Sequence, residues 1–286
     1  MKNCLKTELY KAFRNPMFYL TLGVSMAIIF WNVYEVGAAV AQHTEHTLSM
    51  VAGGRGSGGA QGFSLAVMTI PYNGIFQSGV LYNFIWPILA AVPFGWSYLD
   101  ERRSGVYNQI AVRCGARQYY IAKYIAVFVS GGAAVSFPIL MDFLLCALVC
   151  PYRVVPASLG VSTITNGHFL SQLFYTRPWL HGLIWCGVEF LWGGAAACLC
   201  FLLGAKIRIR VVAMIFPFAL LLVWNNLEAY LHSLPGWFLN LSPLHLFEAD
   251  ALYGANPGWL LFSLIGALTC LSFGIGYWQV VKHELG

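Results

Sequence analysis

The sequence predicts an all-α protein that crosses a membrane six times and forms one transmembrane domain over residues 1–286. Hydrophobic residues make up 59% of the chain and charged residues only 9%, whereas soluble domains carry about 25% charged residues. Apolar runs long enough to cross a hydrocarbon layer about 30 Å thick recur along the sequence, and short polar segments separate them. This composition excludes an ordinary soluble domain.

The amino-terminal segment, residues 1–16, predicts an amphipathic helix that lies in the membrane interface. Leu5, Leu9 and Phe13 recur at four-residue spacing, while the basic residues between them project elsewhere around the helix. Asn15 and Pro16 end this helix, because proline cannot continue a helix interior and disfavours helical geometry in the residue before it. We interpret the segment as an elbow helix that leads into the first span.

Six apolar runs predict the membrane-spanning helices. They cover residues 17–40, 80–98, 125–150, 179–203, 211–232 and 259–281. Residues 41–79 include a glycine-rich stretch and are expected to form a loop. Before the last span, aromatic-rich pieces broken by Pro235, Gly236 and Pro243 predict short helices at the outer face.

The basic residues predict the orientation of these spans. Of the 16 Lys and Arg residues, all but Arg55, Arg153 and Arg177 fall on one side of the six-span layout. By the positive-inside rule, this side is cytosolic and both termini lie there, in a multi-pass protein of the cell membrane. The net charge of +5 therefore reflects topology, so we expect contact with membrane lipid and no nucleic-acid partner.

No motif in the sequence predicts a catalytic, metal or cofactor site. The eight cysteines lie mostly in apolar runs or cytosolic segments, which favours free thiols. The histidines lack the spacing of a metal-ligand motif, and no G-x-x-x-x-G-K-[ST] motif occurs. We therefore expect no catalytic residues, no metal and no ATP site in this chain.

Three acidic residues, Glu35, Asp142 and Glu189, fall within the predicted spans. A charge at the centre of a membrane costs roughly 2.5–3.5 kcal/mol on insertion scales, so such residues need an explanation. They are candidate intramembrane polar sites for an ion or a polar substrate. The alternative is structural: two lie near span ends or are protonated, and Glu189 forms hydrogen bonds inside the bundle.

The segment between the second and third spans, YLDERRSGVYNQIAVRCGARQYYIAKY, is the longest stretch of high charge density. Gly105 permits a turn, and Val106 and Ile110 give a short helix one apolar side. Cys114 and Gly115 end that helix before the chain returns to the membrane. An ordinary positively charged inside loop is the alternative interpretation.

This segment resembles the cytosolic loop of ABC type-2 transporter permeases. In that pattern an acidic residue is followed four residues on by glycine, then by a short helix, a basic residue and a lysine at the next span. Glu101, Gly105, Arg117 and Lys123 are the matching positions. The elbow helix, the six spans and LNLSPLHLF before the last span extend the resemblance over the whole chain. The glycine-rich segment between the first two spans departs from it.

The resemblance implies a permease without an ATPase site of its own. It would pair with a second copy or a homologous permease and dock ATP-binding cassette subunits, which hold ATP and Mg. The implied coupling helix contacts those subunits through Glu101, Arg102, Gly105, Val106, Ile110, Arg113, Arg117 and Lys123. A second cytosolic contact is expected at Lys206, Arg208 and Arg210.

The sequence leaves alternatives open for both the substrate and the class of protein. Aromatic-rich spans with few charges favour export of an amphipathic, peptide or lipid-like substrate over a small ion. The runner-up is a non-transporting polytopic membrane protein, either an intramembrane enzyme or a sensor or assembly subunit.

Overall fold

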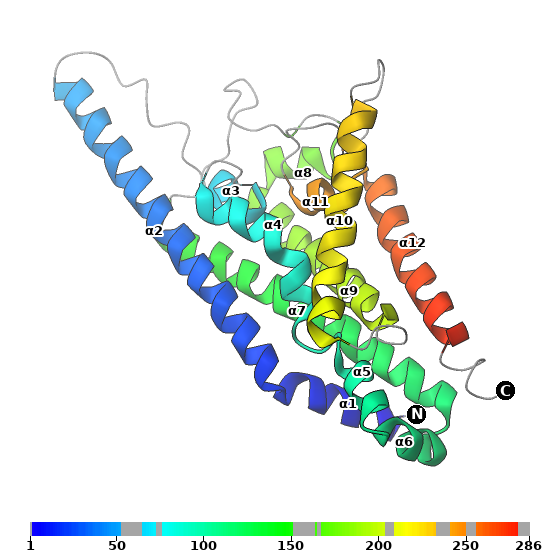
Figure 1. The fold of residues 1–286 in the computed structure, drawn as a ribbon. Helices are drawn as coiled ribbons and strands as arrows, with labels where there is room; N and C mark the ends of the chain where they lie inside the picture. The colour runs from blue at the N-terminus through cyan, green and yellow to red at the C-terminus, as the bar shows by residue number, and fades with distance from the viewer. Residues whose placement is uncertain are drawn as a thin grey trace.

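The computed structural model describes residues 2–52, 65–72, 76–150, 164, 167–203, 209–232, 241–249 and 256–279. Across these residues the backbone forms helices and turns and no strand (Figure 1). Five helices of the described part are long and apolar enough to cross a membrane. They are α2 (Pro16–Ala52, of which Pro16–Glu45 qualifies), α7 (Ala116–Val149), α9 (Pro178–Leu203), α10 (Arg210–His232) and α12 (Gly258–Tyr277). The chain is therefore a helical multi-pass membrane protein.

The predicted span 80–98 is not one continuous helix. Helix α4 (Gln77–Ala91) is 15 residues long, which corresponds to about 22 Å, and a turn separates it from α5 (Ser97–Arg103). Pro93 lies in this turn and cannot donate a helical hydrogen bond. Gly95 packs so tightly there that an added Cβ would lie 2.8 Å from the Sγ of Cys200. Because the residues of this turn are mostly apolar, the hydrophobic pattern of the sequence does not reveal the turn.

The break between the first two helices lies at the residues that the sequence predicted. Helix α1 (Lys2–Arg14) ends before Asn15, and α2 begins at Pro16. The side-chain oxygen of Asn15 accepts a hydrogen bond from the Met17 N–H (3.1 Å), and its amide donates to the Pro93 carbonyl (3.1 Å). Asn15 thus joins the elbow to the turn between α4 and α5.

The predicted loop 41–79 is wrong in its first part, because α2 continues to Ala52. Residues 41–52 contain neither glycine nor proline, so nothing in their covalent structure ends the helix. Beyond it, α3 (Leu65–Met68) and the 3₁₀ turn η1 (Ile70–Tyr72) lead toward α4. The glycine-rich stretch lies outside the described residues.

Helices α7 and α9 form the centre of the bundle. Gly131 and Gly132 of α7 face Gly193 of α9, and a Cβ on Gly131 would lie only 2.3 Å from the Cβ of Ala197. Small residues allow helix backbones to approach closely, which replaces the hydrophobic driving force that is missing between helices in lipid. Helix α7 begins at Ala116, several residues before the predicted span.

Short helices complete the end of the bundle near the start of α9. They are α8 (Ser171–Thr176) and α11 (Pro243–Phe247). The Phe247 ring stacks on Trp86 with centroids 4.4 Å apart, and its carbonyl accepts a hydrogen bond from the Trp185 indole (3.0 Å). Helix α11 is thus the described short helix before the last span, and its buried side chains anchor it in the bundle.

The described basic residues gather at one end of the molecule, which we call the basic end. Helices α1 and α5, the first turns of α7 and α10, and α6 (Val106–Cys114) lie there (Figure 1). Arg177, which follows α8, is the exception among the described residues. We call the other half of the bundle the opposite half.

Candidate functional site

Helices α5 and α6 form a hairpin, residues 97–114, which we call the arm. Gly105 between the two helices has φ 74°, and Gly115 after them has φ 80°, so both expected glycine turns are confirmed. Tyr107 is buried on the inner side of α6, with ring centroids 5.7 Å from Tyr98 and 5.4 Å from Tyr119. The arm therefore rests on α7 through aromatic packing.

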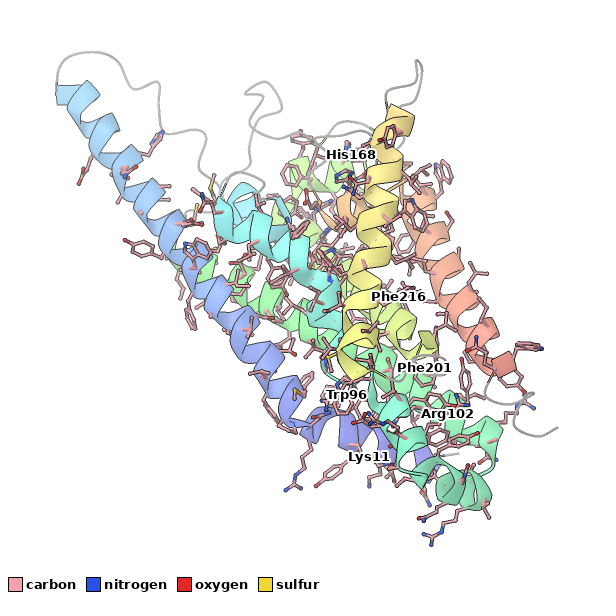
Figure 2. The ribbon with its side chains drawn as sticks, viewed as in Figure 1. Lys11, Trp96, Arg102, His168, Phe201 and Phe216 are labelled. Carbon is pink, nitrogen blue, oxygen red and sulfur yellow. The ribbon has the colours of Figure 1, made fainter. Side chains whose placement is uncertain are left out.

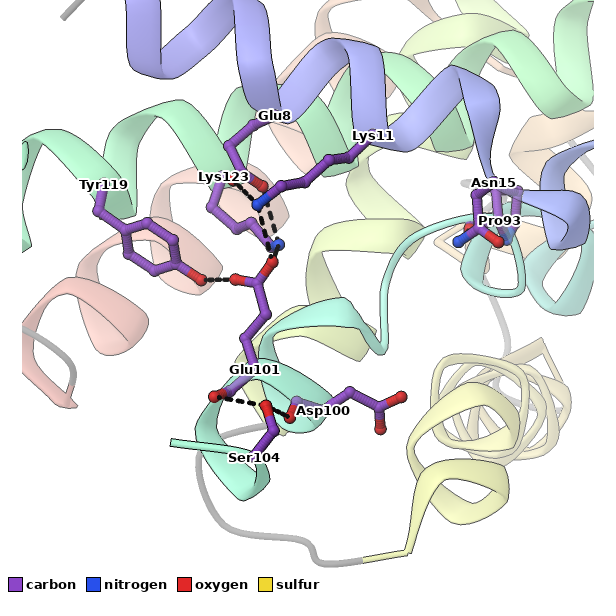
Figure 3. A network of polar contacts seen from close by, with 9 residues as sticks. All are labelled: Glu8, Lys11, Asn15, Pro93, Asp100, Glu101, Ser104, Tyr119 and Lys123. Atoms are coloured by element: carbon purple, nitrogen blue, oxygen red, sulfur yellow. Dashed lines mark hydrogen bonds and ion pairs between the residues drawn. The ribbon is translucent and has the colours of Figure 1, made fainter. Parts of the chain in front are cut away.

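An ion-pair cluster, which we call the latch, fastens the arm to α1 and α7. Its members are Glu8, Lys11, Glu101, Tyr119 and Lys123 (Figure 3). The Lys123 Nζ lies 2.8 Å from a carboxylate oxygen of Glu8 and 2.8 Å from one of Glu101. The Lys11 Nζ lies 2.7 Å from Glu8 and 3.2 Å from Glu101. The Tyr119 hydroxyl donates a hydrogen bond to Glu101. The latch thus joins three helices that are far apart in sequence.

Burial makes the latch sensitive to the loss of any charge. The side chain of Lys123 is 0% exposed, that of Glu8 is 2% exposed and that of Glu101 is 16% exposed. The Lys123 ammonium also lies 4.5 Å from the centroid of the Phe94 ring, a favourable cation–π contact. Two carboxylates and two ammonium groups balance, which is the condition under which buried charges are tolerated.

The latch shifts the pKa values of its members outside the membrane spans. Burial acts to raise the pKa of Glu101, but attraction and hydrogen bonding by Lys123, together with Tyr119 and Lys11, lower it below its usual 4.5. Burial acts to lower the pKa of Lys11, but the hydrogen bond and attraction of Glu8, with Glu101, raise it above 10.5. Both groups are therefore charged at neutral pH.

The predicted coupling residues divide into two groups. Glu101 and Lys123 meet in the latch and Gly105 forms the turn, so these three act inside the chain. Ile110 is partly buried and packs against the aromatic cluster under the arm. The exposed residues are Arg102, Val106, Arg113 and Arg117. The binding of these exposed residues to a partner stays a prediction.

Sequence reasoning missed Glu8 and Lys11. Glu8 is the only acidic residue of α1, and Lys11 follows it at a spacing that allows an ion pair within the helix. A lone acid on an otherwise basic amphipathic helix is the signal that could have identified the pair.

The predicted second cytosolic contact is described only at Arg210, because Lys206 and Arg208 lie outside the described residues. The Arg210 guanidinium lies 3.2 Å from the centroid of the Trp96 ring, and one of its nitrogens lies 3.8 Å from the Asp100 carboxylate. Figure 2 shows Trp96 close to the first turn of α10. Arg210 thus connects α10 to the base of the arm.

A second polar cluster lies in the opposite half and includes two of the predicted acidic residues. Asp142 is fully buried and accepts hydrogen bonds from the Asn32 amide (2.8 Å) and the Ile70 N–H (2.8 Å). The Ser78 hydroxyl contacts the Asn32 side-chain oxygen (3.0 Å) and the Glu35 carboxylate (2.5 Å). The sequence suggested neither Asn32 nor Ser78 as partners of these acids.

Glu189, the third predicted acidic residue, lies fully buried on α9. Neither of its carboxyl oxygens has a hydrogen-bond partner in the described part of the chain. The alternative interpretation, in which Glu189 forms hydrogen bonds inside the bundle, therefore has no support from these residues. Among them, no three His, Cys, Asp or Glu side chains converge as a metal ion would need.

The fold and these two clusters define the class of the protein as a helical multi-pass membrane protein with a charged arm at one end. No protein-family model matches the sequence, and no curated protein matches it.

Proposed function

We propose that this chain is the membrane-spanning subunit of an ATP-driven ABC transporter that exports an amphipathic, peptide or lipid-like substrate. ATP and Mg bind to a separate ATP-binding cassette subunit, and the chain pairs with a second copy or a homologous permease. The basic end faces the cytosol, and both termini lie there. Helix α4, extended by its turn and α5, is the sixth crossing.

The observation that carries this proposal is the latched arm at the basic end. The inner side of the arm is fixed by Tyr107 and Glu101, while its outer side presents Val112, which is 87% exposed, together with Arg113 and Arg117. An exposed apolar residue flanked by arginines suits an acidic, partly apolar surface on a soluble partner.

The latch supports a route for force from such a partner into the bundle. Lys123 lies on α7 and pairs with Glu101 of the arm and Glu8 of α1, so a displacement of the arm acts on both helices. Helix α7 then packs against α9 through Gly131 and Gly193 without intervening side chains. Close packing of this kind transmits a shift and does not absorb it. Glu101 accordingly acts as the internal attachment of the arm, and the exposed face of α6 binds the partner.

The proposal is tested by purification of the tagged chain from its native membrane. We expect a P-loop ATPase to co-purify in a two-to-two ratio, and the reconstituted complex to hydrolyse ATP. The double variant Arg113→Glu/Arg117→Glu should lose the ATPase and leave the unfolding midpoint of the chain unchanged.

The matched control is Arg177→Glu, which reverses an exposed charge at the opposite half and should retain the ATPase. A solitary chain that is active without any ATPase would contradict the proposal and favour a non-transporting membrane protein. A reporter fused after Gly286 that is active only outside the cytosol would contradict the orientation.

A further inference from the structure

Glu189 and Asp142 are two buried carboxyl groups with different surroundings. Asp142 on α7 accepts hydrogen bonds from the Asn32 amide, the Ile70 N–H and the Cys146 thiol, the last at 3.6 Å. All three are donors, so they stabilise the ionised form of Asp142 and offer no acceptor for a carboxyl O–H. The hydrogen-bond partners of Asp142 thus favour a negative charge on its carboxyl group.

The surroundings of Glu189 favour the opposite state. Its side chain is 0% exposed, and both carboxyl oxygens lack a hydrogen-bond partner in the described chain. An ionised carboxylate without partners in an apolar interior is strongly unfavourable, and the group takes up a proton instead.

Among the described residues, neither carboxyl group forms an ion pair with a lysine or an arginine. The titratable groups around the two acids are Tyr72 of η1, Tyr82 of α4, Cys146 of α7 and Cys186 of α9. His181 of α9 contacts the Tyr72 hydroxyl at 2.5 Å, and Glu35 of α2 connects to Asp142 through Ser78 and Asn32. None of these is a lysine or an arginine, so an ion pair does not neutralise Glu189.

We propose that Glu189 is a proton-binding site, in which its carboxyl group holds one proton while Asp142 on α7 stays ionised. A proton is the ligand that fits, because no group of three His, Cys, Asp or Glu side chains of the described residues converges as a metal ion would need. Two acids whose surroundings separate their protonation states have different roles, and the one without donors is the one that holds the proton.

The hydrogen bonds around Asp142 form a network that is separate from Glu189. Asp142, Asn32, Ser78 and Glu35 form a continuous chain of hydrogen bonds, and Glu35 is half-buried. Glu189 has no hydrogen bond to this chain in the described part of the protein, so its proton is held by the carboxyl group alone. The inference stands independently of an ATPase partner.

Infrared spectroscopy of the full chain in lipid nanodiscs tests the site at neutral pH. We expect the carbonyl stretch of a protonated carboxyl group, which Glu189→Gln removes and Asp142→Asn retains. Glu45→Gln, which removes an exposed carboxyl, is the matched control and also retains the band. A spectrum without this band, or a band that Glu189→Gln leaves intact, overturns the proposal.

The unfolding midpoint gives a second measurement on the same variants. Glutamine resembles a neutral glutamic acid in shape and polarity, so Glu189→Gln should leave the midpoint unchanged. Asp142→Asn should lower it, because an amide NH₂ then faces donors. A midpoint lowered as much by Glu189→Gln as by Asp142→Asn, or a Glu189→Gln chain that does not fold, means that the charge of Glu189 is required and overturns the proposal.

Discussion

The latch at the basic end buries two carboxylates beside two lysines, whereas in the opposite half Asp142 and Glu189 are buried and form no ion pair with a described lysine or arginine. In the latch each charge is neutralised by an ion pair, and the result is a fixed attachment between helices. In the opposite half, donors stabilise one carboxylate and a proton neutralises the other. Buried acidic residues can therefore have two roles. With a basic partner they form a fixed connection between helices, and without one they can bind and release a proton.

The largest effect is expected from Lys123→Met, which removes the shared cation of the latch. Glu8 and Glu101 then lose their buried ion-pair partner and keep only the more exposed Lys11, and loss of one partner from a buried ion pair costs about 3–5 kcal/mol. Unfolding of the purified chain in detergent measures the change. Lys6→Met, which removes an exposed lysine from α1, is the control and should change stability little. Equal effects of the two substitutions on the free energy of unfolding would show that the latch does not stabilise the fold.

Glu101→Gln is expected to cost about 1.5–3 kcal/mol, because it weakens charged hydrogen bonds but leaves Lys123 paired with Glu8. It also changes the pH dependence of stability. The pKa of Glu101 is lower in the folded protein than its usual 4.5, so its stabilisation is complete above 4.5 and is lost as the pH falls through the folded value.

The free energy of unfolding measured as a function of pH tests this assignment. The wild-type chain should lose stability below pH 4.5 more steeply than Glu101→Gln. Parallel curves for the two chains would contradict the role of Glu101 in the latch.

In the opposite half, Asp142→Ala is expected to cost about 1–3 kcal/mol, because it leaves the buried Ile70 N–H without its acceptor. The Asn32 amide keeps a contact with the Met68 carbonyl (3.4 Å), so the effect should concentrate where η1 meets α7. Hydrogen exchange at Ile70 should increase before global unfolding. Protection at Ile70 equal to that of the wild-type chain would mean that Asp142 does not hold η1 in place.

The smallest effect is expected from Lys11→Met, at about 0–1 kcal/mol, because the Lys11 side chain is 36% exposed and water screens its ion pairs. The pKa of Lys11 is raised in the folded protein, so its stabilisation is present below 10.5 and is lost as the pH rises above the folded value. The free energy of unfolding, measured near neutral pH, compares Lys11→Met with Lys123→Met. A cost for Lys11→Met as large as that for Lys123→Met would contradict the importance of burial in the latch.

The sequence predicted the features that depend on local chemistry. The break at Asn15 and Pro16, the turn at Gly105 and the end of α6 at Cys114 and Gly115 all follow from residues that restrict or free the backbone. The five long helices follow from apolar runs longer than a soluble helix needs. The turn at Pro93 was missed because its neighbours are apolar and it lies inside a run that looked continuous.

The partners of the charged residues could not be predicted in the same way. Glu8 and Lys123 are 115 positions apart, and Asn32 and Asp142 are 110 positions apart. Nothing in either local sequence marks the other residue as its partner. The acidic residues were found as candidates, but the packing of α1, α2 and α7 determines which of them is paired and which is not.

Photo-crosslinking from the arm tests the central claim most directly. A photoreactive amino acid at Val112, on the exposed face of α6, is compared in native membranes with the same group at Gln172, an exposed position of α8 in the opposite half. We predict an adduct with a P-loop ATPase from position 112 and none from position 172. Absence of an ATPase adduct from position 112, or equal adducts from both positions, would contradict the account.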